Sequence, residues 1–122
     1  MITPVTITGS LSYPDGSKAN GSFTFVLTLD GEPSGMVNGT EMIAPLTIIG
    51  TWNDGELMIS PVGGGPYEPL MLLAVDDPGT TPTGLVYTVT EQLGSGLGLP
   101  PWPLTVSHTS PTLDISSQRP VP

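Results

Sequence analysis

The sequence predicts an all-β protein: a single antiparallel β-sandwich of seven to eight short strands, Ig-like or Greek-key, with extended ends. In several segments apolar and polar residues alternate with a period of two, which is typical of strands that bury one face. Gly and Pro, 16 and 15 of the 122 residues, separate these segments. No helical period is long enough to predict a helix. Short strands with regular turn signals favour a sandwich.

The strand pattern can be followed along the whole chain. The segments that carry it are 5–13, 21–29, 46–52, 56–60, 69–75, 85–91, 104–108 and 112–116, with room for a short strand at 36–37. The first two segments are expected to form a hairpin with its turn at Pro14-Asp15-Gly16, because Pro and Gly suit the dihedral angles of a turn. Asn53-Asp54-Gly55 predicts a tight hairpin between the third and fourth segments.

Two segments lack alternation and are interpreted from their composition. Residues 69–75 are almost continuously apolar, which predicts a central strand buried on both faces. Residues 94–103 are rich in Gly and Pro and are expected to be an extended crossover between sheets, since Pro has no N–H for a central strand. We expect residues 1–122 to form one domain, with 1–4 and 116–122 as extended terminal arms.

The charge balance excludes several classes of partner. The chain has a net charge of −9, and Lys18 and Arg119 are its only Lys and Arg residues. Two distant cations cannot bind nucleic acid phosphates or an anionic membrane surface. There is no cysteine, no signal-peptide pattern and no apolar stretch of membrane-spanning length. The sequence therefore predicts a soluble product of the cytoplasm that contacts other proteins, not nucleic acid or membrane.

Few residues suggest catalysis or metal binding. His108 is the only histidine, and a small hydrolase would need it beside a serine and a carboxylate. No G-x-S-x-G motif is present, and we expect His108 to end an edge strand. Asp76-Asp77 is the one adjacent acidic pair and could contribute to a calcium site, but neighbours on an extended chain point apart. We therefore expect a protein that is not an enzyme and has no cofactor or metal.

The candidate site residues are those that could contact a partner. Trp102 lies among prolines, beside Pro101, where a rigid aromatic side chain can anchor an interface or, alternatively, close one end of the sandwich. Trp52 precedes the Asn53-Asp54-Gly55 turn and is expected to pack in the core or cover a sheet end. Met1, Ile2 and Val121 lie in the terminal arms, which we expect to contact a neighbouring subunit or a shell.

Several segments resemble small β-modules of virion proteins from actinobacterial phages. Residues 5–16 (VTITGSLSYPDG) are similar to the opening strand and turn of such modules, 72–78 and 84–91 to later strands, and 105–108 with 112–115 to the closing pair. These modules occur as capsid decoration proteins, head fibres and parts of minor tail proteins. The resemblance implies a structural protein without catalytic residues.

We consider three hypotheses of function, of which the first two follow from the resemblance and the third is an enzyme unrelated to those modules. The first is a capsid decoration protein that binds the major capsid protein or another virion protein on the outside of the head; it is made in the host cytoplasm and is expected to be a homo-oligomer, with a trimer implied by the resemblance. The second is a minor tail or tail-fibre module that binds host glycan by stacking sugar on an exposed Trp52 or Trp102. The third is a small hydrolase that uses His108.

Overall fold

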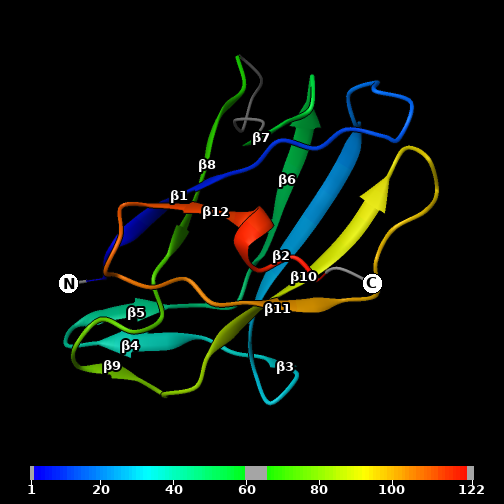
Figure 1. Ribbon diagram of the computed structural model, residues 1–122. Coiled ribbons are helices and arrows are strands. Elements are labelled where there is room, and N and C mark those ends of the chain that lie inside the picture. Colours follow the sequence, from blue (N-terminus) through cyan, green and yellow to red (C-terminus); the bar gives the residue numbers. More distant parts are fainter. Residues whose placement is uncertain (1, 60–65, 121–122) are drawn as a thin grey trace.

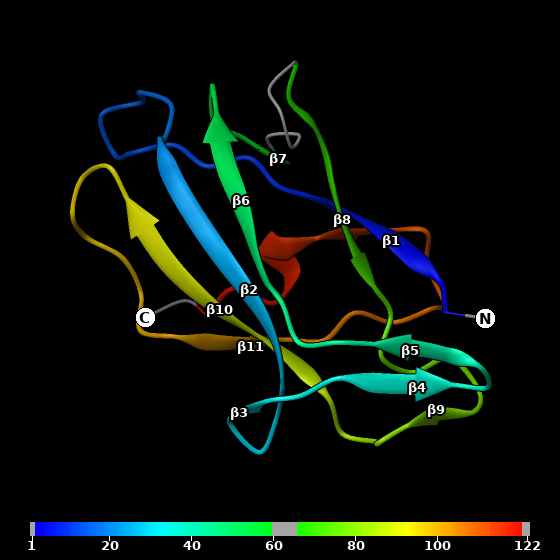
Figure 2. The same cartoon turned by 180° about the vertical axis from the view of Figure 1, so that it is seen from behind.

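The computed structural model describes residues 2–59 and 66–120 and is all-β, which confirms the predicted fold class. The strands form two layers that face each other across one core, so the arrangement is sandwich-like (Figures 1 and 2). In this part of the chain the only helix is a single 3-10 turn, η1, at Ile115–Ser117. No helix in the described residues has the length and apolar character needed to cross a membrane.

The described residues contain more strands than the sequence pattern predicts. Their bounds are β1 Pro4–Thr8, β2 Gly21–Leu29, β3 Glu32–Pro33, β4 Met36–Asn38, β5 Glu41–Ile43, β6 Thr47–Asn53, β7 Glu56–Ile59, β8 Glu68–Leu73, β9 Thr80–Thr81, β10 Val86–Leu93, β11 Trp102–Leu104 and β12 Thr112–Asp114. β3, β5 and β9 were not expected, because strands of two or three residues are too short to show alternation.

The main sheet has nine strands and curls on itself. Its order is β11-β10-β2-β6-β7-β8-β1-β12, with β3 beside β2, and a separate sheet of order β5-β4-β9 lies across one end. Strands β11, β10, β2 and β6 form one layer, and β8, β1 and β12 form the other (Figure 1). The short strand β7 pairs with β6 and with β8 and so joins the layers.

The core lies between the two layers and is filled by their inward-facing side chains. Phe25 of β2 and Leu70 of β8 are both fully buried. Both side chains come close to Gly50 in β6, because a Cβ placed there would lie 3.1 Å from Phe25 and 3.2 Å from Leu70. Because glycine has no side chain, Gly50 leaves room for Phe25 and Leu70 to pack between the two layers.

The predicted β6–β7 hairpin is confirmed. Asn53 pairs with Glu56, and the two residues between them, Asp54 and Gly55, have φ of 53° and 79°. Positive φ at both central residues is the requirement of the tight primed turn that Asp-Gly favours. Local sequence was therefore sufficient to specify this connection.

The predicted hairpin between segments 5–13 and 21–29 is wrong. β1 pairs antiparallel with β8 and parallel with β12, while β2 pairs with β6 and β10. The turn residues form only a local connection, in which Ser12 bridges Lys18 and the Tyr13 N–H donates to the Ser17 carbonyl. The parallel β1–β12 pair also means that the sandwich is not antiparallel throughout. Burial of the apolar face decides which strands pair, and turn residues alone do not.

Two further strand predictions need correction. β8 buries one face only, since Leu70 and Leu72 are buried whereas Met71 is 50% exposed. The expected strand at 104–108 is displaced toward the N-terminus: β11 is Trp102–Leu104, and His108 lies in a turn. Pro103 can occupy β11 because this is the edge strand of the sheet, where one backbone side needs no partner.

The described residues of both ends pack on the chain instead of forming extended arms. Ile2 is 4% exposed, and the Thr3 N–H and hydroxyl both donate to Asp77, each at 2.7 Å. At the other end, Gln118 and Arg119 follow η1 and bond to Thr105 and Glu91. Each end buries an apolar side chain, Ile2 or Ile115, which explains why it stays on the core.

Candidate protein-binding groove

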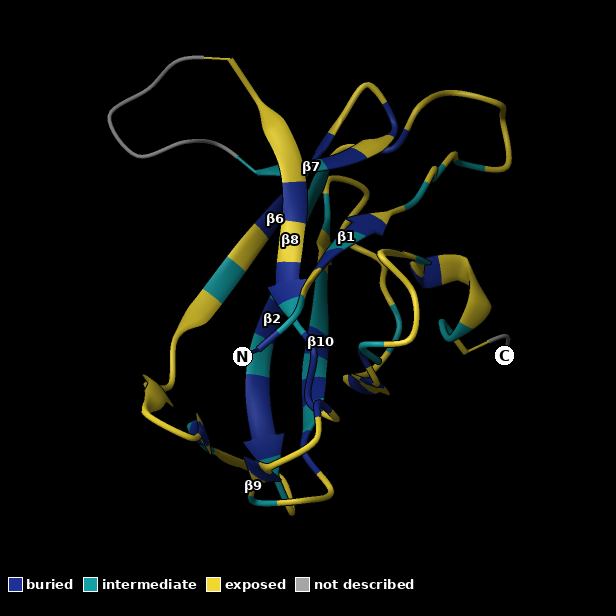
Figure 3. Cartoon of the chain, turned by 90° about the vertical axis from the view of Figure 1, so that its left-hand side faces the viewer, coloured by how far each residue is buried: buried dark blue, intermediate teal, exposed yellow. Residues whose placement is uncertain are grey.

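An opening lies between the layers where β6 and β8 diverge. Both strands pair with β7 near one end: β6 through Thr51–Asn53 and β8 through Glu68 and Pro69. Beyond β7 the two strands separate (Figure 3). Within the described residues, positions 47–50 of β6 then pair only with β2, and positions 70–73 of β8 pair only with β1. Each strand therefore presents a backbone edge at this opening.

The opening is an apolar groove. It encloses a cavity of about 180 Å³ and is lined by Leu27, Ile43, Ala44, Leu46, Ile48, Met71, Leu73 and Tyr87. The Tyr87 hydroxyl donates to the Leu73 carbonyl at 2.7 Å. Burial raises the pKa of Tyr87 to about 12. No lining side chain therefore carries a charge at neutral pH, and the one polar group has its partner.

Two large apolar side chains that line this apolar groove are exposed, and a third stands exposed on the outer face of β6. Leu46 is 69% exposed and Met71 50%, and Ile49, on the outer face of β6, is 54% exposed. Covering a large aliphatic side chain contributes about 1.5–3 kcal/mol. Single exposed apolar residues are common, but a cluster around a groove marks a site of protein contact.

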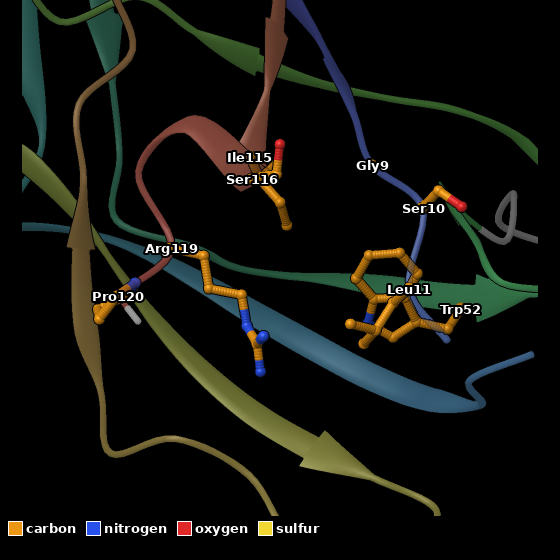
Figure 4. A pocket seen from close by; sticks show the side chains of 8 residues that line it. All are labelled: Gly9, Ser10, Leu11, Trp52, Ile115, Ser116, Arg119 and Pro120. Carbon is orange, nitrogen blue, oxygen red and sulfur yellow. The ribbon is translucent and has the colours of Figure 1, made fainter. Parts of the chain in front are cut away.

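A second cavity, of about 250 Å³, lies where the C-terminal segment meets Trp52 (Figure 4). Its lining is Gly9, Ser10, Leu11, Trp52, Ile115, Ser116, Arg119 and Pro120. The Arg119 guanidinium binds both carboxylate oxygens of Glu91 at 2.8 Å. Because this cation is already paired, the cavity has no free charge with which to hold an anion.

The two tryptophans predicted as contact residues lie in the core. Trp102 is 3% exposed, and its Nε1 donates to Glu91 at 2.9 Å. Trp52 is 4% exposed, and both rings meet Phe23 edge to face, at centroid distances of 5.1 Å for Trp52 and 6.5 Å for Trp102. Trp102 therefore packs inside the sandwich, in line with the alternative that it closes one end, and is not exposed to a partner. The expectation of an exposed tryptophan that stacks on sugar is wrong for both residues.

The other predicted contact residues are scattered. Pro101 is exposed beside β11, whereas Ile2 is buried and its N–H bonds Glu41 at 3.2 Å. Met1 and Val121 lie outside the described residues. The structure therefore does not bring the predicted residues together into one surface.

His108 forms a polar cluster with Asp76 and Ser107. The His108 Nδ1 lies 2.9 Å from the Asp76 carboxylate, the His108 N–H donates to the same carboxylate at 2.7 Å, and the Ser107 hydroxyl does so at 2.6 Å. Burial raises the pKa of Asp76, but these hydrogen bonds outweigh it and bring the pKa to about 2. A catalytic serine would donate to the histidine. Here it donates to the carboxylate, so the cluster ties two loops and does not have the geometry of a triad.

The acidic pair Asp76-Asp77 has separate partners, as expected for neighbours on an extended chain. Asp77 accepts the two hydrogen bonds from Thr3, while Asp76 binds the loop at 107–108. Residues 2–59 and 66–120 hold no cluster of three or more His, Cys, Asp or Glu side chains suited to a metal ion.

Sequence reasoning missed the residues that form the apolar groove. Leu46 and Met71 have the pattern of ordinary strand residues, because alternation cannot tell an inner face from an exposed one where the sheet opens. One feature of the sequence does distinguish the segment that leads into β6. Residues 42–50 (MIAPLTIIG) carry no charge in a chain of net charge −9.

Comparisons with protein families, with curated proteins and with solved structures find no match for this chain. The resemblance to phage virion modules therefore depends on the strand and turn pattern of the sequence alone.

Proposed function

We propose that this chain is a structural protein that acts by docking to other proteins, and specifically a capsid decoration protein on the outer surface of a phage head. The observation that carries the docking role is the apolar groove between β6 and β8. It presents uncharged side chains and two strand edges on the surface of an otherwise acidic molecule. Strand edges and apolar clusters are both common means of protein contact.

The virion assignment is supported by the sequence resemblance and by charge. A net charge of −9 disfavours binding to released DNA and to anionic envelopes, so the acidic surface suits the outside of a particle. We propose the major capsid protein, or another protein of the head, as the partner. No residue acts as a catalyst in this role, and the glycan-binding and hydrolase hypotheses gain no support from Trp52, Trp102 or His108.

The test is binding to particles that lack the protein. Wild-type chain added to such particles is expected to occupy the head at a fixed stoichiometry. Leu46→Glu combined with Met71→Glu is expected to lower occupancy at least about tenfold, because two aliphatic contacts of this size are lost. Leu97→Glu combined with Ser95→Glu is the matched control, since it adds the same charge in an exposed loop that does not line the groove. Equal occupancy by both double variants would contradict the role of the groove.

A further inference from the structure

We infer that the edge of β6 is the contact through which two copies of this chain pair, strand against strand, about a twofold axis. This inference names a partner for the apolar groove and so rests on the docking function proposed above. Three observations support it: the length of the free edge, the uncharged side chains along it, and the negative charge of the rest of the molecule.

The free edge of β6 is short and has clear limits. On one side Pro45 has no N–H to donate, so regular pairing starts after it. On the other side Thr51 already pairs with Met58 of β7. Within the described residues, positions 47–50 pair with β2 on one side and with no strand on the other, and Leu46 lies between Pro45 and the start of β6. A partner strand of about this length can add there.

The chemistry of this edge restricts what can add to it. The sequence at 46–50 is LTIIG, and the apolar groove beside it has no ionisable group other than the neutral Tyr87. A complementary strand is therefore extended, apolar and uncharged. The chain itself presents such a strand at this place, and antiparallel pairing of the edge with its own copy satisfies both edges at once.

Charge favours a second copy at this place over a basic partner. Arg119 is held by Glu91, and Lys18 is the only other Lys or Arg in the chain. Two copies with a net charge of −9 each repel one another wherever their acidic surfaces meet. Contact between copies therefore requires a surface without charge, which the edge of β6 provides. A basic partner would instead be attracted most strongly to the acidic surfaces elsewhere on the molecule.

The limits of the edge also fix the register. The middle of 46–50 is Ile48, so Ile48 lies opposite its counterpart in the second copy, and Thr47 lies opposite the counterpart of Ile49. Directly opposite Cα atoms in an antiparallel pair are about 4.5–5.5 Å apart. The added strand lies beside β6 over the opening between β6 and β8, and it shields Leu46 and Met71 from water.

The first test is the molar mass in solution, measured by sedimentation over a range of concentrations. The wild-type chain is expected to be a dimer. Thr47→Glu combined with Ile49→Glu places like charges opposite each other across the axis and is expected to raise the dimer Kd at least about tenfold. Both side chains face outward, so the fold tolerates them. The loop variant Leu97→Glu with Ser95→Glu carries the same added charge and is expected to dimerise as the wild type does.

The second test is a cross-link, which is clean because the chain contains no cysteine. Mild oxidation of Ile48→Cys is expected to give a disulfide-linked dimer, since the Cα separation across the axis falls within the range for a disulfide. Leu97→Cys is the control and is expected to remain mostly uncross-linked. Equal cross-linking of both variants, or a monomeric wild-type chain at every concentration, would overturn the proposal.

The two proposals fail in different ways. A monomeric chain that still occupies the head overturns the pairing and leaves the decoration function in place. A chain that dimerises and cross-links at Ile48 but binds no particle overturns the decoration function and leaves the pairing.

Discussion

Arg119 and Glu91 form a bidentate ion pair that joins the C-terminal segment to β10. Arg119 Nε and one terminal nitrogen lie 2.8 Å from the two oxygens of Glu91, and the Glu91 side chain is fully buried. The same carboxylate accepts the Leu99 N–H at 3.0 Å and the Trp102 indole N–H at 2.9 Å. Four donors meet on one buried carboxylate. Burial raises the pKa of Glu91, but the hydrogen bonds from Arg119, Leu99 and Trp102 outweigh this effect and lower it.

Glu91→Gln is expected to lower the free energy of unfolding by about 2–3 kcal/mol, measured by urea denaturation. The change keeps the size of the side chain but removes the charge that pairs with Arg119, and the new amide cannot accept at both ends. We place the value below that of a fully buried pair because 28% of the Arg119 side chain is exposed. Glu32→Gln removes the same charge from exposed β3 and is expected to change stability by less than about 0.5 kcal/mol. An equal effect of the two variants would contradict this account.

Gln118→Ala is expected to cost about 1 kcal/mol of stability. The Gln118 side chain accepts from the Thr105 N–H and donates to the Thr105 carbonyl, both at 2.7 Å, just beyond β11. It therefore links the segment that follows β12 to the opposite edge of the curled sheet. Because the group is partly exposed, each hydrogen bond contributes toward the lower end of the usual range. Thermal unfolding measures the loss, and an unchanged midpoint would show that this link contributes nothing.

Gly50→Ala is expected to destabilise the fold by about 1–3 kcal/mol, the usual cost of overpacking a core. The added Cβ would lie 2.8 Å from Leu57, as well as close to Phe25 and Leu70. These side chains come from β7, β2 and β8, so no single strand can move aside to make room. Chemical denaturation gives the value, and a neutral or stabilising substitution would mean that the layers are not packed as described at this point.

The His108–Asp76 pair predicts a pH dependence of stability. The hydrogen bond with Asp76 raises the pKa of His108 above its ordinary value of 6.5. A raised folded-state pKa gives stability that is fully present below pH 6.5 and is lost as the pH rises through the folded value. The stability advantage of wild type over His108→Gln is therefore expected to shrink between pH 5 and pH 8. Urea unfolding across this range tests it, and an advantage that is constant with pH would contradict the pairing.

The sequence predicted local features well and long-range pairing poorly. Segment 21–29 coincides with β2, and the Asp54-Gly55 turn forms as expected, because alternation and turn chemistry are local properties. The hairpin of 5–13 with 21–29 failed because β1 finds its partners, β8 and β12, far along the chain. No local pattern specifies such pairs.

The candidate site illustrates the same limit. Trp52 precedes a turn and Trp102 lies among prolines, which made both candidates for contact with a partner, yet both pack on Phe23 inside the sandwich. The exposed side chains that matter, such as Leu46 and Met71, are apolar members of strand-like segments. Their exposure follows from the separation of β6 and β8 beyond β7, and that is a property of the tertiary arrangement.

The most direct test of the central claim is the difference density between cryo-electron microscopy maps of particles with and without this chain. Added density is expected at regular positions on the outside of the head, into which the two-layered fold fits with the edge of β6 turned toward a second copy of the chain. Density at the tail tip, or identical maps of the two particles, would contradict it.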